Sequence, residues 1–563
     1  MSGKKKIVRS FFCTVIIFIL MFNFTSCKKS DSEKIKSLNV GTVGITGNFN
    51  PFFAESEGDL RVINQVFRSV QRRNSNNKLV NSAGSISYEL IGDKQVKYTV
   101  TIRNDLYFSD GSNVDIDDVI FFYYFISDAM YKGVYSDFYL NDIVGLKEYY
   151  YDSENYLEEL KAINSGNVSD RDIEAYISNN YSDGINVDKI SGINRVDNYT
   201  CTVLFNSRNI NAISAINAVI LSKDFYSVDY VKGSVSTVEN IRSGAMGCGP
   251  YCIPEYKPGE KNLELSPNPF YYDKSPVFNR LIFRDYADNT EKMEDDIAGG
   301  KIDVASFTAK PSVINKLNSG SLKYFFNNSD GYISAFVNTS VLPEISDRKQ
   351  LLTGCNNYDW LDSEYGSYYT RLNRPLSVRF EEYPSNSEAY FSGIAILQLI
   401  KSSIGTVGIY CVGDKNSVEY KLAQEFEKSL TKSDISVNIV TCNYDELKPA
   451  VKSGEALIWI MKVNEPATCD KYDYYHSGAV FNLTGISDEY IDSATQEIRS
   501  SVGLAERKEL TGKLLDYIIR QSVEMPVCQF QTVTVYNTET INPESISDLT
   551  GYDGFDYVIP ILY

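Results

Sequence analysis

The residues that could perform chemistry are few in kind. The chain of 563 residues contains one histidine, His476, so any Ser-His-Asp or Cys-His arrangement must use it and no multi-histidine metal site can be built. The motifs GxSxG, GxxxxGK(S/T) and HExxH are missing. Because Asp and Glu number 73, pairs of carboxylates at any given spacing arise by chance. We therefore interpret His476 as a hydrogen-bonding residue at the surface or between domains, and we expect no catalytic residue, no metal and no cofactor.

The charge and the composition narrow the function classes further. Acidic residues outnumber the 55 basic ones, and the formal net charge is −18. A nucleic-acid partner is disfavoured, because a polyanion is bound through a field of Lys and Arg. A hydrophobic content of 43% is enough for large buried cores, and the length indicates more than one domain.

The N-terminus has the pattern of an export signal. Basic residues at positions 4, 5, 6 and 9 precede an apolar stretch of 14 residues from Phe11 to Phe24, which is too short to span a bilayer. Phe24-Thr25-Ser26-Cys27 resembles the lipobox of bacterial lipoproteins, which implies lipidation of Cys27; an ordinary signal peptide with a chance cysteine is the alternative. The sequence thus predicts a signal peptide at 1–26 and a lipid-anchored tether at 27–37.

Alternating and helical patterns mark the elements of the body. KYTVTIR at 97–103 is typical of a half-buried strand, and Asp115 is placed to cap a helix that carries FFYYF. That aromatic run could be a stacking platform for sugars or bases, but its helical spacing favours core packing.

The later half predicts an α/β unit. Strands are expected at 406–411, 436–441 and 456–460, with helices between them, and right-handed crossovers would place the strands in one parallel sheet. Ligands bind beyond the carboxyl ends of such strands, which singles out Trp459 and the residues that follow it.

The cysteines are interpreted mainly as small buried apolar residues. Cys248 and Cys252 lie in GCGPYC, which gives a structural zinc site only weak support. Cys411 and Cys442 lie at the carboxyl ends of two neighbouring predicted strands, which are about 4.8 Å apart, so we expect proximity, and a disulfide if the side chains converge.

Three stretches of the chain carry recognisable motifs: YTVTIRNDLYFSDGSNVDIDDVIFFYYF at 98–125, GCGPYCIPEYKPGEKNLELSPNPFYY at 247–272 and GYISAFVNTS at 331–340. Together they resemble one family, the oligopeptide- and dipeptide-binding solute receptors of ABC transporters (family 5). The first stretch follows the family's strand, turn and helix signature, the second is the most specific match, and the third matches a further strand. The resemblance covers most of residues 38–560.

The resemblance implies an α/β, two-lobed periplasmic-binding-protein-like fold with a hinge between the lobes, class II and of the large type with an extra subdomain. The expected division is lobe I at 38–60 with 185–270 and 525–563, its subdomain at 61–184, and lobe II at 271–524. Closure about the hinge would enclose the ligand. After Arg348 the chain departs from the family, because the stretch from Lys349 to Gly405 is short and lacks the family's helix pattern.

The implied function is capture of a peptide or peptide-like solute for an ABC permease by a lipid-anchored monomer on the extracytoplasmic face of the membrane, without enzymatic activity. Alternatives are a non-peptide ligand (oligosaccharide, metal chelate or signalling molecule) on the same fold, and a surface adhesin or enzyme. The predicted ligand-binding residues are Glu55, Ser56, Glu57, Tyr332, Trp459, Ile460, Met461 and Lys462.

Lys462 distinguishes the predicted site from those of the family's peptide receptors. In the family's peptide receptors an acidic residue stands at this position and pairs with the ammonium group of the peptide. Lysine would repel a free amino terminus, so the sequence predicts a ligand that is acidic, N-blocked or otherwise without a free amine. Glu55 and Glu57 could supply the missing acid or pair with Lys462, and a solvent-facing Lys462 is the alternative.

Overall fold

The computed structural model describes residues 36–73, 78–163, 170–287, 289–318, 320–329, 331–385, 388–401, 404–465 and 468–546, with the single residues 559 and 562. The predicted signal peptide, Cys27 and the tether up to residue 35 lie outside the described residues. Within the described ranges, no helix combines the length and the apolar character needed to cross a bilayer.

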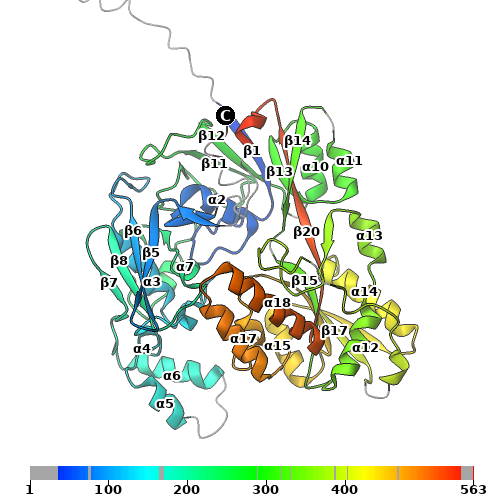
Figure 1. Ribbon diagram of the computed structural model, residues 1–563. Coiled ribbons are helices and arrows are strands. Elements are labelled where there is room, and N and C mark those ends of the chain that lie inside the picture. Colours follow the sequence, from blue (N-terminus) through cyan, green and yellow to red (C-terminus); the bar gives the residue numbers. More distant parts are fainter. Residues whose placement is uncertain are drawn as a thin grey trace, which may run out of the picture.

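A long mixed sheet runs through the molecule (Figure 1). Among the described residues its order is β10-β11-β12-β1-β13-β20-β15-β19-β17-β18, and β14 and β16 also pair with β20. Its strands are β10 (Tyr251–Cys252), β11 (Asn262–Pro267), β12 (Arg280–Asp285), β1 (Ser37–Thr42), β13 (Val304–Thr308), β14 (Leu322–Asn328), β20 (Glu524–Asn537), β15 (Tyr332–Val337), β16 (Tyr369–Arg371), β19 (Ile458–Val463), β17 (Val407–Val412) and β18 (Val437–Cys442).

A second sheet has the order β5-β6-β8-β7 and is antiparallel throughout. Along β6 (Gln95–Ile102) half-buried and buried residues alternate, as the sequence pattern predicts. The other strands are β5 (Gly84–Ile91), β8 (Thr200–Phe205) and β7 (Ile193–Arg195), and two short pairs add β2 (Arg68–Ser69) with β9 (Val219–Ile220) and β3 (Gln71–Arg73) with β4 (Leu79–Asn81).

Helices cover both sheets. They are α2 (Glu57–Val66), α3 (Ile116–Ile126), α4 (Leu146–Tyr151), α5 (Tyr156–Ile163), α6 (Asp170–Ser182), α7 (Ala212–Ala215), α8 (Lys223–Tyr226), α9 (Ser236–Glu239), α10 (Thr290–Ala298), α11 (Pro311–Leu317), α12 (Ile345–Cys355), α13 (Asp359–Tyr365), α14 (Val418–Thr431), α15 (Tyr444–Ser453), α16 (Tyr472–Tyr475), α17 (Glu489–Ser500) and α18 (Leu504–Gln521). Asp115 caps α3 in a capping box with Asp118, as predicted. The FFYYF run is mostly buried in the core rather than exposed as a platform.

The predicted α/β unit is confirmed. β17 pairs in parallel with β18 and with β19, and α14 and α15 form the connections between them.

The two cysteines of this unit are close but do not form a disulfide. Cys442 lies opposite Val412, one residue beyond Cys411, and successive side chains of a strand point to opposite faces. Cys411 therefore packs in one apolar cluster and Cys442 in another. The expected proximity is confirmed, and the expected bond is wrong because the side chains diverge; the eight cysteines that the structure describes are free thiols.

Residues 349–405 form helices although their sequence lacks the family's helix pattern. Helix α12 begins at Ile345 and ends at Cys355, and α13 follows at Asp359–Tyr365. The buried face of α12 includes Arg348, whose guanidinium donates to the carbonyl oxygens of Leu342, Pro343 and Gln521. A charged residue on the buried face interrupts the apolar periodicity that sequence patterns detect.

Two large apolar clusters define the lobes. One draws on residues 38–304 together with the C-terminal Tyr536, Ile541, Ile559 and Leu562, and the other on residues 333–530. β20 passes between them, with its first half on β15 and β16 and its second half on β13 and β14 (Figure 1). The residue limits of the two lobes stay a prediction. Strands β12 and β13 fall in the range predicted for lobe II (271–524), yet they pair with β1, which falls in the range predicted for lobe I.

Candidate functional site

Two of the predicted site residues, Tyr332 and Trp459, are buried in one apolar cluster formed by β15, β19 and α15. The Tyr332 hydroxyl donates to Glu524 Oε1 over 3.1 Å, and Lys471 Nζ is 3.0 Å from Glu465 Oε1 and 3.4 Å from the Tyr332 oxygen. Trp459 stacks on Phe336 in the same apolar cluster as Tyr332. Burial raises the pKa of Glu524 to about 7, because desolvation disfavours the carboxylate.

Lys462 lies on the other face of β19. Its strand neighbour two residues earlier, Ile460, packs in the cluster that contains α14 residues, whereas Trp459 and Met461 belong to the opposite cluster. The positive charge of Lys462 acts on Glu419 of α14, where it opposes the rise in pKa that burial causes. Lys462 thus has a carboxylate neighbour within its own lobe.

The remaining predicted residues lie at the start of α2. Ser56 is its N-cap and accepts a hydrogen bond from the Asp59 amide, and Glu55 and Glu57 are exposed beside it. The eight predicted residues are absent from the walls of the two cavities described next.

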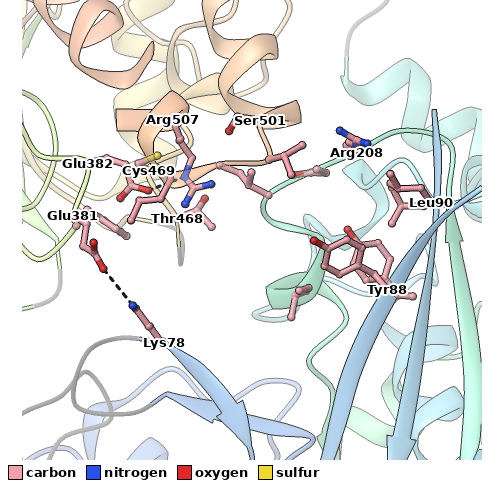
Figure 2. A pocket seen from close by; sticks show the side chains of 18 of the residues that line it. Lys78, Tyr88, Leu90, Arg208, Glu381, Glu382, Thr468, Cys469, Ser501 and Arg507 are labelled. Carbon is pink, nitrogen blue, oxygen red and sulfur yellow. Dashed lines mark hydrogen bonds and ion pairs between the residues drawn. The ribbon is translucent and has the colours of Figure 1, made fainter. Parts of the chain in front are cut away.

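The first cavity has a volume of about 560 Å³, within the range of roughly 300 to 1,000 Å³ that small-molecule sites occupy. Figure 2 shows its two sides: Tyr88, Leu90 and Arg208 face Arg507, Glu382, Thr468 and Cys469 across the space. The first side comes from β5 and the segment after β8; the second comes from the segments before and beside α18.

The two walls differ in chemistry. Tyr88, Leu90, Val96 and Tyr98 lie on one face of the β5-β6 pair and form an apolar surface. On the opposite wall, charges are paired: Arg507 Nε is 2.7 Å from Glu382 Oε1. Lys78 bridges to Glu381 over 3.5 Å from the strand side. Such a site can hold and orient a solute that has both apolar and charged parts.

A short segment, residues 208–211, docks onto the opposite wall and is called here the docking segment. The Asn211 amide donates to Asp470 Oδ2 over 2.6 Å, and the Thr468 hydroxyl donates to Asn211 Oδ1. The Ile210 amide donates to the Arg499 carbonyl over 2.8 Å, and the Ile210 side chain packs against the apolar cluster around α17 and α18.

The docking segment separates the first cavity from a second one of about 760 Å³. Arg208 and Asn209 line both cavities. The second cavity lies between residues 140–156 and residues 472–500. Arg499, on its wall, also pairs with Asp470 over 2.7 Å, so the same carboxylate serves both the docking segment and α17.

Sequence reasoning missed the residues of the first cavity. Tyr88 and Leu90 belong to an alternating strand, and nothing in that pattern shows that their face extends past the core. The cavity arginines are scattered between positions 208 and 507, so only the folded chain brings them together. His476, as predicted, is a hydrogen-bonding residue: its Nδ1 accepts from the Gly478 amide over 3.1 Å. Among the described residues, no three His, Cys, Asp or Glu side chains form a group that could hold a metal ion.

Known proteins match this chain in sequence pattern and in fold. Residues 91–479 match the bacterial extracellular solute-binding proteins, family 5 Middle, and no curated protein sequence matches the chain. The solved structures that share the fold include three described here. The oligopeptide-binding protein AppA from Bacillus subtilis, in complex with a nonapeptide, has a TM-score of 0.66 at 15% identity, with 89% of this chain and 94% of that one covered.

The second is the ABC transporter substrate-binding protein CtaP from Listeria monocytogenes, with a TM-score of 0.68, 18% identity, and coverage of 94% of this chain and 99% of that one. The third is NikZ from Campylobacter jejuni in complex with Ni(L-His), with a TM-score of 0.61, 17% identity, and coverage of 89% and 94%.

Two lobes, a strand that passes between them and a cavity with walls from distant segments define a two-lobed binding protein. The chain belongs to the bacterial extracellular solute-binding proteins, family 5, of ABC transporters.

Proposed function

We propose that the protein captures a peptide or peptide-like solute between its lobes and delivers it to an ABC permease. The observation that carries this proposal is the first cavity, whose walls come from segments more than 300 residues apart in the sequence, such as Tyr88 and Arg507. A solute there touches both walls at once, so its binding energy favours the closed arrangement over the open one.

The same fold serves relatives with different ligands, a nonapeptide in AppA and Ni(L-His) in NikZ. The ligand of this chain is therefore to be identified directly. Native mass spectrometry of protein purified gently from its host should show an added mass that disappears on denaturation, and fragmentation should give peptide-type products. A retained mass that corresponds to a sugar or a metal chelate would contradict the peptide assignment and indicate that other ligand class.

The ligand role predicted for Lys462 belongs to the same proposal. If Lys462 repels a free amino terminus, N-acetylated peptides should bind more tightly than their free-amine counterparts, and Lys462→Ala should remove the difference. Calorimetric titration of both peptide forms measures this. Equal affinities in the wild type, or a difference that survives the substitution, would contradict the predicted role and leave Lys462 as the neighbour of Glu419.

We further propose a lipid anchor at Cys27. Cys27→Ala should move the protein from the membrane fraction to the medium or periplasm, because several acyl chains hold a lipoprotein firmly to the bilayer. Fractionation followed by mass spectrometry of the N-terminus checks the prediction. An unprocessed protein that stays in the membrane fraction would contradict it.

A further inference from the structure

We propose that the first cavity selects an amphipathic anion: a solute whose apolar group lies on Tyr88 and Leu90 and whose anionic group binds Arg208. This inference rests on the proposed function, since it takes the first cavity to be the solute site. It adds the charge and polarity of the solute and the residues that recognise them.

Arg208 is a cation on the wall of this cavity. The structure gives its side chain no ion pair or hydrogen bond with any residue it describes, although the chain has 73 acidic against 55 basic residues. Lys78 and Arg507, on the same cavity, bridge to Glu381 and Glu382. Arg208 is half-buried, and a charge that is partly removed from water without a partner is unfavourable.

The carboxylate of Asp142, beside this segment, is already engaged. Asp142 accepts hydrogen bonds from Asn206 Nδ2, over 3.0 Å, and from the Ser207 hydroxyl, over 2.7 Å. It forms no ion pair with Arg208 among the described contacts. The guanidinium therefore has donors left for a solute carboxylate or phosphate, which it can bind in a bidentate manner.

The apolar half of the site is equally open. Tyr88 is 57% exposed and Leu90 is 49% exposed, whereas Tyr98 and Val96, opposite them on β6, are buried. Large exposed apolar side chains that continue a core face are typical of ligand contacts, and a tyrosine ring adds an aromatic surface at low entropic cost. Leu90 and Arg208 lie near the same end of the cavity (Figure 2), so one small solute can reach both.

The docking segment fixes Arg208 in place. Ile210 and Asn211, two and three residues further along, are held by packing and hydrogen bonds to the opposite wall. The anion-binding side chain is therefore placed by contacts of its own segment with the opposite wall, which links recognition of the anion to closure.

The first test uses the tripeptide Ala-Ala-Phe and three analogues: its C-terminal amide, Ala-Ala-Ser and the amide of Ala-Ala-Ser. Calorimetric titration of the wild type should show the free acid of Ala-Ala-Phe binding roughly tenfold tighter than its amide, as loss of a charged hydrogen-bonded pair predicts. Exchange of Phe for Ser should weaken binding independently. Arg208→Gln should remove the difference between acid and amide, and Arg208→Lys should restore part of it.

A matched control is Arg195→Gln, which removes the same charge from the second sheet. Arg195 pairs with Asp117 at the surface, outside the cavity, so the difference between acid and amide should persist there. Equal binding of acid and amide by the wild type, or an equal loss of both in Arg208→Gln, would overturn the proposal.

The second test separates this inference from the proposed function. Solutes released by denaturing the wild type and Arg208→Gln are compared by mass spectrometry. An apolar anion that is not a peptide, present only in the wild type, supports the inference and contradicts the peptide assignment. A neutral or cationic peptide released from the wild type supports the peptide assignment and contradicts the inference. No retained solute together with no binding of any tripeptide would overturn both.

Discussion

At the scale of single residues, Glu524 is expected to make stability depend on pH. Its side chain is fully buried, and burial raises its pKa to about 7 from 4.5. Between these two values the folded chain holds a proton that the unfolded chain releases, so stability falls as the pH rises through this window and levels off above it. The slope is on the order of 1.4 kcal/mol per pH unit.

Glu524→Gln should flatten this dependence. The amide oxygen can still accept from Ser334 and Tyr332, which bond to Glu524 Oε1 over 2.6 and 3.1 Å, but it has no proton to release. Urea unfolding midpoints of wild type and variant at pH 5, 6, 7 and 8 measure the effect. The unfolding midpoints of the wild type and the variant should converge or cross as the pH rises. A wild type whose stability increases from pH 5 to pH 7, with the variant parallel to it, would contradict the assigned protonation.

The sequence predicts those residues best whose role depends on their immediate neighbours in the chain. Asp115 as a cap and FFYYF as core follow from neighbouring residues alone. The cavity residues depend on contacts across hundreds of positions, and whether Arg208 finds a carboxylate is decided by the fold. That explains why the predicted site centred on β19, while the cavity walls come from β5, the docking segment and the region of α18.

At the scale of elements, the docking segment is expected to act as a contact between lobes. Asn211→Ala removes the hydrogen bonds to Thr468 and Asp470 but leaves the pair of Asp470 with Arg499. Hydrogen exchange at the Ile210 amide, which bonds to the Arg499 carbonyl, should become several-fold faster, since a typical hydrogen bond contributes about 1 kcal/mol. The melting temperature should change little.

Asn194→Ala is the matched control, because its amide bonds only to Ser191 within the same sheet region. Exchange at Ile210 should be unaffected in that variant. Unchanged exchange in Asn211→Ala would show that the segment is held by Ile210 alone.

The strand register of the α/β unit predicts the thiol content. Cys411 and Cys442 point to opposite faces of the sheet, so the eight cysteines from Cys201 to Cys528 should all react when the protein is denatured without reductant. Six reactive thiols and a peptide pair joining Cys411 to Cys442 would contradict this register. The sequence predicted both strands but not their offset by one residue, because patterning fixes the face of a residue only once its partner strand is known.

At the scale of the whole molecule, the sequence predicted the α/β two-lobed fold through motifs spread along the chain, and the family match confirms it. The helix α12 escaped prediction because its buried Arg348 bonds to the carbonyl oxygen of Gln521, far away in the sequence. The pairing of β12 and β13 with β1 joins segments more than 200 residues apart, a relation that local patterns do not contain.

At the same scale, we propose that a solute is captured by closure of the two lobes over it. Small-angle X-ray scattering tests this most directly, on protein emptied by reversible denaturation and then refilled with the solute released from it. Because the described structure joins the walls through Asn211, Asp470 and Thr468, the refilled protein should scatter as this arrangement does. The emptied protein should have a larger radius of gyration. Identical scattering curves, with the solute bound, would contradict capture by closure.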